Sequence, residues 1–149
     1  MKQKLPAFLA MLVFFIAWFL PVERDGVRLA DGMLPGYEAF RVAVAPIFSL
    51  GRGAAGGPSV RELFFGVSAL TNLLIWYALF VAAVYPRRFW PSLRTLSILL
   101  VVALCVNAQW LLPSEGQRLN LRIGYWVWCA SFPLMALALH RLGRSAPAA

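Results

Sequence analysis

The sequence has few charged residues for its length. Only 13% of its 149 residues are charged, whereas 61% are hydrophobic, and a soluble domain carries about twice that charged fraction. This shortage excludes an ordinary soluble surface, and a mean hydropathy of +0.72 points in the same direction. We therefore expect one integral membrane domain that covers residues 1–149.

Side chains with reactive chemistry are also scarce. The single histidine, His140, cannot supply the two imidazoles of a membrane haem, and no Asp or Glu lies deep inside an apolar block. The buried carboxylate expected of a proton-coupled exporter is therefore missing. The sequence has no glycine-rich phosphate loop and no paired-histidine metal motif. We predict a non-catalytic protein without catalytic residues, cofactor or metal.

The two cysteines exclude one further class of membrane enzyme. Cys105 and Cys129 lie at similar depth in consecutive apolar blocks, and the sequence leaves open whether they touch. Membrane enzymes that form disulfides need paired cysteines in exposed outer segments, and residues 21–59 contain none. We expect both thiols to behave as small apolar side chains.

The charge that is present is mainly positive. The chain has 14 Lys and Arg against 6 Asp and Glu, a formal net charge of +8. In a soluble protein this excess would suggest nucleic-acid binding. Here the basic residues are scattered between apolar blocks, so we predict no nucleic-acid partner and interpret them as markers of membrane orientation.

Four apolar blocks predict four membrane-spanning helices. A helix needs roughly 17 to 25 residues to cross the hydrocarbon layer, and the expected helices cover about residues 5–22, 60–85, 93–112 and 121–140. Short connectors with proline separate the last three, which predicts an all-α membrane protein built as an antiparallel four-helix bundle. The basic start "MKQK" could also begin a secretory signal, but the bulky residues of "AWFLPV" do not resemble a cleavage site, so we expect the first helix to be retained.

The charges beside the blocks predict the orientation. Lys and Arg are equally numerous on the two sides, seven on each, but all six acids fall on one side. The acid-free side comprises Lys2, Lys4, Arg87, Arg88, Arg94, Arg141 and Arg144. These residues lie close to helix ends, where the positive-inside bias acts. We expect a plasma-membrane protein (a bacterial inner membrane) with both termini in the cytoplasm.

The first outer loop, residues 21–59, is large and contains a candidate amphipathic helix. Apolar residues recur there at spacings of three and four, which predicts one apolar stripe. The stripe consists of Met33, Tyr37, Phe40, Val44, Ile47 and Phe48. Pro46 is expected to bend or end the helix, and Ser59 with Glu62 fits a capping box for the following span. The helix either covers the bundle or docks a partner, with Tyr37, Phe40, Val44, Ile47 and Phe48 as the candidate partner surface.

Polar side chains interrupt the second apolar block. Ser68, Thr71 and Asn72 are spaced at i, i+3 and i+4, which places them on one helix face. An amide in such a position can form a hydrogen bond to a neighbouring helix. We interpret Asn72 as an interhelical contact, and the alternative is a polar cavity for a solute or a lipid headgroup.

The third and fourth blocks add further candidates for helix packing or for a pocket. Asn107 and Gln109 are two residues apart, so on a regular helix they point in nearly opposite directions and cannot share one site. Pro133 removes the hydrogen bond to the carbonyl of Cys129. That carbonyl then needs Ser131, a neighbouring helix or water as its partner.

These features favour a binding or assembly role over catalysis. We expect an accessory or scaffold subunit, or a membrane-resident binding protein, whose partners are the lipid bilayer and either another membrane protein or a second copy of the chain. One alternative is a small permeation or lipid-binding protein that uses a polar pocket around Asn72. A weaker alternative is an enzyme on a lipid substrate, with Arg118 and Arg122 binding phosphate.

Overall fold

The computed structural model describes residues 4–24, 33–49, 60–84, 90–111 and 121–144. These residues form mainly helices: α1 (Leu5–Phe19), α2 (Gly36–Ser49), α3 (Val60–Val84), α4 (Trp90–Asn107) and α5 (Ile123–Arg144). A short 3-10 helix, η3 (Ala108–Leu111), continues α4. Two short strands, β1 (Pro21–Arg24) and β2 (Met33–Pro35), form an antiparallel pair.

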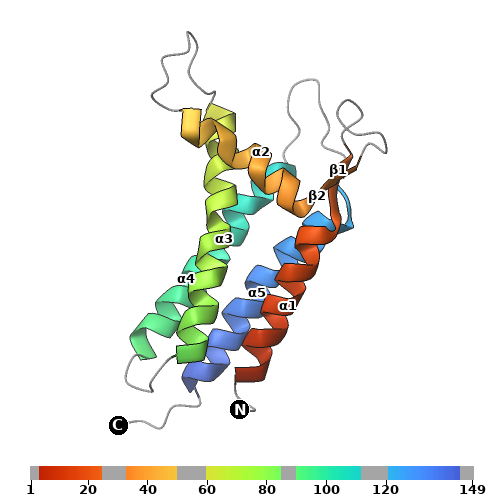
Figure 1. The fold of residues 1–149 in the computed structure, drawn as a ribbon. Helices are drawn as coiled ribbons and strands as arrows, with labels where there is room; N and C mark the ends of the chain where they lie inside the picture. The colour runs from red at the N-terminus through yellow and green to blue at the C-terminus, as the bar shows by residue number, and fades with distance from the viewer. Residues whose placement is uncertain (1–3, 25–32, 50–59, 85–89, 112–120, 145–149) are drawn as a thin grey trace.

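Four helices form a bundle and the fifth crosses one end of it. α1, α3, α4 and α5 lie lengthwise and alternate in direction, while α2 and the strand pair lie at the end opposite to both chain termini (Figure 1). We call these the α2 end and the terminal end. α5 is the central helix, because it packs extensively against both α1 and α4, and α2 packs mainly on α3.

Three segments are long and apolar enough to cross a membrane. They are Leu63–Val84, Leu93–Leu111 and Ile123–Arg144. α1 is more apolar than these segments but has only 15 residues, and it ends three residues earlier than the sequence predicted. Leu20 is extended, with ψ at 150°, because the ring of Pro21 disfavours a helical conformation in the preceding residue.

A short strand pair, which the sequence did not predict, adds to the mainly helical fold. β1 follows α1 directly, and its Glu23 and Arg24 pair with Leu34 and Met33 of β2 through an irregular register. Its Val22 carbonyl also accepts the backbone N–H of Arg122, at 2.8 Å. The segment between α1 and α3 therefore contains a strand pair as well as the predicted helix, and the backbone of the pair is hydrogen-bonded to the start of α5.

Two glycines allow this junction to pack backbone against backbone. A Cβ atom on Gly124 would lie 2.7 Å from the carbonyl oxygens of Leu20 and Pro21, and one on Gly36 would lie 2.5 Å from the carbonyl oxygen of Ala17. Real Cβ contacts are longer than this. The end of α1, the start of α2 and the start of α5 are therefore held in close contact at the α2 end.

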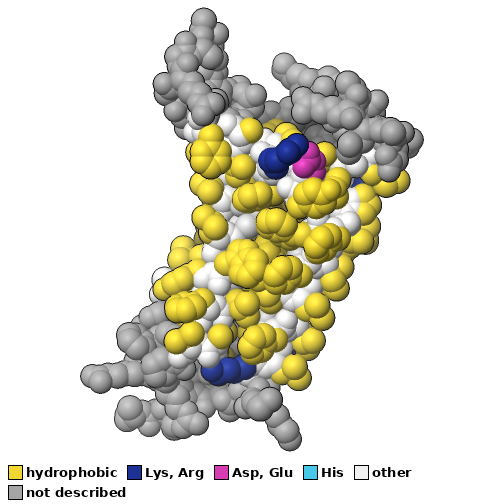
Figure 2. Space-filling view, viewed as in Figure 1, with side chains coloured by type: hydrophobic (Ala, Val, Ile, Leu, Met, Phe, Trp, Pro, Cys, Tyr) yellow, Lys and Arg dark blue, Asp and Glu magenta, His cyan; other side chains and the backbone are white. Residues whose placement is uncertain are grey.

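The core runs along the bundle, and apolar side chains also cover its outside. The largest core side chains are contributed by all four lengthwise helices and include Phe14, Ile75, Leu100, Phe132 and Met135. Figure 2 shows hydrophobic side chains along the whole length of one face, with the described charged side chains at its two ends. An apolar belt between polar ends is the surface expected of helices in lipid.

Candidate functional site

A cluster of polar side chains lies inside the bundle near the α2 end. Asn107, the last residue of α4, is fully buried, and so is Ser68 of α3. The Ser68 hydroxyl donates to Asn107 Oδ1 at 2.8 Å. Asn107 Nδ2 lies 3.2 Å from Thr71 Oγ1, which itself donates to the Ser68 carbonyl at 2.6 Å. One amide therefore binds two hydroxyls on successive turns of α3.

Aromatic side chains complete the hydrogen bonding of this cluster. Trp110 Nε1 donates to Ser68 Oγ at 2.9 Å, and its ring stacks on Phe65 with centroids 4.4 Å apart. The Tyr125 hydroxyl donates to the Asn107 carbonyl at 3.0 Å. That carbonyl lies at the junction between α4 and η3. The cluster thus joins α3, α4, η3 and α5.

Asn72 belongs to a second contact, between α3 and α5. Its Oδ1 accepts a hydrogen bond from Trp128 Nε1 at 2.7 Å, and the side chain is 6% exposed. Ser68, Thr71 and Asn72 do lie together on α3. They divide between two neighbours, however, with Ser68 and Thr71 bonded to α4 and Asn72 bonded to α5.

Gln109 also contacts α3, although the helical spacing predicted that it points away from Asn107. Gln109 Nε2 donates to the Phe64 carbonyl at 2.8 Å, one turn from the residues that Asn107 binds. The prediction assumed a regular α-helix over this stretch, but the chain changes to the 3-10 helix η3 at Ala108. The tighter winding alters the direction of each side chain after that residue.

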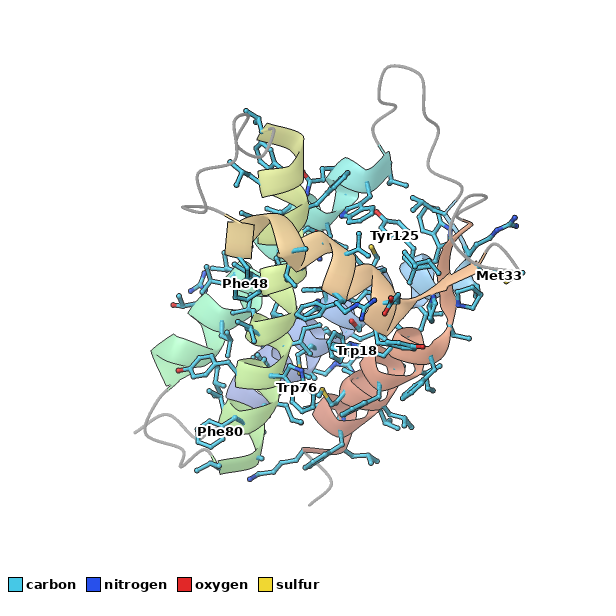
Figure 3. All side chains as sticks on the ribbon, turned by 45° about the horizontal axis from the view of Figure 1, so that its top comes forward. Trp18, Met33, Phe48, Trp76, Phe80 and Tyr125 are labelled. Atoms are coloured by element: carbon cyan, nitrogen blue, oxygen red, sulfur yellow. The ribbon has the colours of Figure 1, made fainter. Side chains whose placement is uncertain are left out.

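A small cavity lies beside these contacts, beneath α2. Its wall includes Trp18 of α1, Phe40 of α2, Ser68 and Asn72 of α3, and Trp128 of α5. Figure 3 shows Trp18 and Tyr125 on either side of α2. Its volume of about 50 Å³ is enough for only a few waters, because one water needs roughly 10–15 Å³.

The predicted partner stripe on α2 is divided by the structure. Phe40 packs on Trp18, with ring centroids 5.4 Å apart, and Ile47 lies against Gly66 of α3. Tyr37 and Phe48 are 50% and 72% exposed. Val44 is half-buried. The predicted residues therefore do not form one exposed face, and of the five only Tyr37 and Phe48 are openly available to a partner.

The face of α2 that packs on the bundle is made largely of small residues. Gly36, Ala39 and Ala43 line the cavity together with Phe40. Small residues at spacings of three and four allow helices to approach closely. This pattern was present in the sequence, but the large apolar side chains beside it dominated the periodicity. Pro46 does not end the helix, which continues to Ser49.

The remaining candidates lie away from the cluster. Ser131 is buried and donates to the Trp128 carbonyl at 2.6 Å, not to the carbonyl that Pro133 leaves free. Pro133 is exposed, and α5 continues through it to Arg144. The two cysteines are free thiols, with Cys105 exposed and Cys129 buried.

Three contacts were missed from the sequence. Ser97 Oγ joins α4 to α5 by bonding the carbonyls of Leu93 at 2.8 Å and Ala136 at 3.1 Å. The donors Trp110 and Trp128 looked like ordinary apolar residues. A useful signal was available, because a buried indole N–H almost always needs an acceptor.

Some predicted residues fall outside the part of the chain that the structure describes. Ser59 and Arg118 are among them, as is the side chain of Glu62. The predicted capping box and the predicted phosphate-binding arginine pair therefore have no described geometry. In the described ranges, no three His, Cys, Asp or Glu residues come together in a group that could hold a metal ion.

The cluster can form hydrogen bonds, and its members are hydroxyls, amides, indoles and one phenol. These groups already bond to one another across helix boundaries, so the arrangement fixes the relative positions of α3, α4 and α5. Comparison of the chain with known protein families, with curated proteins and with solved structures finds no match.

Proposed function

We propose that this chain is a four-span protein of the plasma membrane that acts as an accessory or scaffold subunit or as a membrane-resident binding protein. Its partner would be another membrane protein or a second copy of the chain. The observation that carries this proposal is the internal pairing of the polar side chains. Trp128 holds Asn72, and Asn107 holds Ser68 and Thr71, so these groups serve the bundle itself and not a solute path.

The fourth span in this proposal is α1. At 15 residues, it is only about 22 Å long at a rise of 1.5 Å per residue. It nevertheless reaches from Gly124 at the start of α5 to Ala83 near the end of α3, whose carbonyl accepts from Lys4 Nζ at 2.6 Å. A short span of this kind is completed by a long basic side chain at its end.

The small volume of the cavity beneath α2 supports a role in assembly and argues against a role in solute permeation. A space of about 50 Å³ is far below the roughly 300–1,000 Å³ of small-molecule sites. The outer apolar surface is extensive by comparison, and it includes Tyr37 and Phe48 of α2, which lie at the end that we assign to the outside of the cell.

The test is gentle purification of the full-length protein from its own membrane, followed by identification of stoichiometric companions and of the oligomeric state. We expect a companion or a defined oligomer that is lost in Phe48→Glu, because a charge replaces an exposed apolar contact. Val60→Glu, also at an exposed apolar position near the α2 end, is the matched control and should keep the complex.

A different result would support the permeation alternative. The purified protein would then be monomeric, and vesicles containing it alone would conduct a solute. In that case Asn72→Leu would abolish the flux while leaving the protein folded, and the assembly proposal would be wrong.

A further inference from the structure

We propose that a groove between α4 and α5 at the terminal end binds the phosphate headgroup of an anionic phospholipid. The groove has a volume of about 330 Å³ and is lined by Leu93, Arg94, Leu139, His140 and Arg144. This volume lies at the lower end of the range for small-molecule sites, roughly 300–1,000 Å³. It suits a headgroup and the first atoms of its glycerol.

Basic side chains approach the groove from both helices. His140 and Arg144 are four residues apart on α5, so they lie on one face of that helix, and Arg94 comes from the antiparallel α4. All three side chains are exposed. Two guanidinium groups on opposite walls suit a phosphate, because each can donate two parallel hydrogen bonds to its oxygens.

The floor of the groove is apolar and its walls are held apart at a fixed distance. Leu93 and Leu139 are 4% and 0% exposed. Ser97 Oγ, one turn along α4 from Leu93, bonds to the Ala136 carbonyl of α5 at 3.1 Å. This contact joins the two walls close to the groove, so the site is formed before any ligand binds.

The positive charge of the groove has no acidic counterpart in this part of the chain. The sequence has no Asp or Glu between Glu62 and Glu115 and none after Glu115. α4 and α5 are therefore free of acidic residues. The dipole of α5 places negative partial charge near Arg144, whereas the N-terminus of α4 adds positive partial charge near Arg94. A bound anion would balance the positive charge that remains in the groove.

The position of the groove favours a lipid over a free phosphate ion. α4 and α5 are both long and apolar enough to cross a membrane, and the groove lies at their ends, at the depth of the headgroups. Basic pockets between spanning helices at that depth recognise acidic headgroups. The buried leucines would meet the apolar part of the same lipid.

The experiment measures lipid retention by the full-length protein in mixed micelles, with phosphatidylglycerol and phosphatidylcholine of identical acyl chains as probes. We expect tighter binding of phosphatidylglycerol to the wild type. Arg94→Gln with Arg144→Gln should weaken that binding by roughly fivefold for each arginine removed, as expected for a basic residue near a membrane surface. Binding of phosphatidylcholine should not change.

The matched control replaces two arginines that come earlier in the sequence, outside α4 and α5, as in Arg28→Gln with Arg41→Gln. The control should bind like the wild type, and equal loss in both double variants would overturn the proposal, as would equal binding of the two lipids. Binding of millimolar inorganic phosphate without retention of phosphatidylglycerol would reject a lipid headgroup as the ligand. If the double variant aggregates, Arg144→Gln alone keeps the test available, because that side chain is exposed.

Discussion

Among single residues, Asn72 shows how an amide is accommodated in an apolar helix. Its Oδ1 accepts from the Trp128 indole, so two polar groups that lipid could not satisfy pair with each other. Asn72→Leu leaves the indole N–H without that partner. We expect the free energy of unfolding to fall by about 1–2 kcal/mol, measured by thermal or denaturant unfolding in detergent.

The matched variant for this prediction is Trp128→Phe, which removes the donor. The double variant should lose clearly less than the sum of the two single losses, because the second change leaves no additional polar group unpaired. Additive losses would mean that the bond contributes little and that each residue acts through packing alone.

Asn107 should be the more sensitive of the two amides. It contacts the hydroxyls of both Ser68 and Thr71 and is fully buried. Asn107→Leu would leave the buried Ser68 hydroxyl and the half-buried Thr71 hydroxyl with fewer partners, at about 1–3 kcal/mol for each group left unsatisfied. We expect a larger fall in thermal stability than for Asn72→Leu. A smaller fall would show that Ser68 and Thr71 find other acceptors.

The sequence revealed the α3 side of these two contacts. The spacing of Ser68, Thr71 and Asn72 was enough to place them on one face of a helix. Their partners could not be predicted, because helix order in a bundle and the vertical offset between helices are set by packing over the whole contact surface. The switch to a 3-10 helix at Ala108 was also invisible, and it changed where Gln109 points.

At the scale of helices and strands, the junction at the α2 end requires the backbone of α5 at Gly124 to approach the backbone of Leu20 and Pro21 closely. Gly124→Ala would place a Cβ 2.7 Å from the carbonyl oxygens of Leu20 and Pro21. Backbone atoms cannot rotate away, so we expect a loss of about 1–3 kcal/mol in unfolding free energy from overpacking.

Gly66→Ala is the control for that prediction. Its Cβ would meet the side chain of Ile47, at 2.5 Å, and a side chain can adopt another rotamer. Gly66 lies in the interior of α3, whereas Gly124 lies in the first turn of α5, so the gain in helix propensity is larger for Gly66→Ala. Gly66→Ala should therefore be the milder change in a thermal unfolding assay. The reverse order would mean that α2 is held more rigidly than the junction.

Helices were easier to predict than the strand pair. Long apolar blocks bounded by proline and glycine placed α3, α4 and α5 to within a few residues. β1 and β2 have four and three residues, too few for an alternating pattern, and β1 begins at a proline. Their pairing depends on contact with the start of α5, which is remote in the sequence.

For the whole molecule, the alternating directions of the helices predict on which side of the membrane each connecting segment lies. Single cysteines at Gln3, Ala54 and Ser145, each in a variant with alanine at positions 105 and 129, should report two sides of the membrane. An impermeant thiol reagent should label Ala54→Cys in intact cells. Gln3→Cys and Ser145→Cys should react only after permeabilisation. The basic residues on their side are accompanied by no Asp or Glu, and such a side favours the cytoplasm.

Two outcomes would contradict parts of this arrangement. Labelling at positions 3 and 54 from the same side would mean that α1 does not cross, and three spans would remain. The reverse pattern, with positions 3 and 145 labelled in intact cells, would keep four spans and invert the orientation.

The central position of α5 has a consequence for how the protein is made. α5 packs against α1 on one side and α4 on the other, yet the ribosome synthesises it after both of them. Until α5 has entered the bilayer, α1 lacks its most extensive contact and the polar groups of α3 lack the Trp128 indole. A chain that stalls before residue 121 would thus leave the Asn72 amide without its indole partner and α1 without its main packing surface.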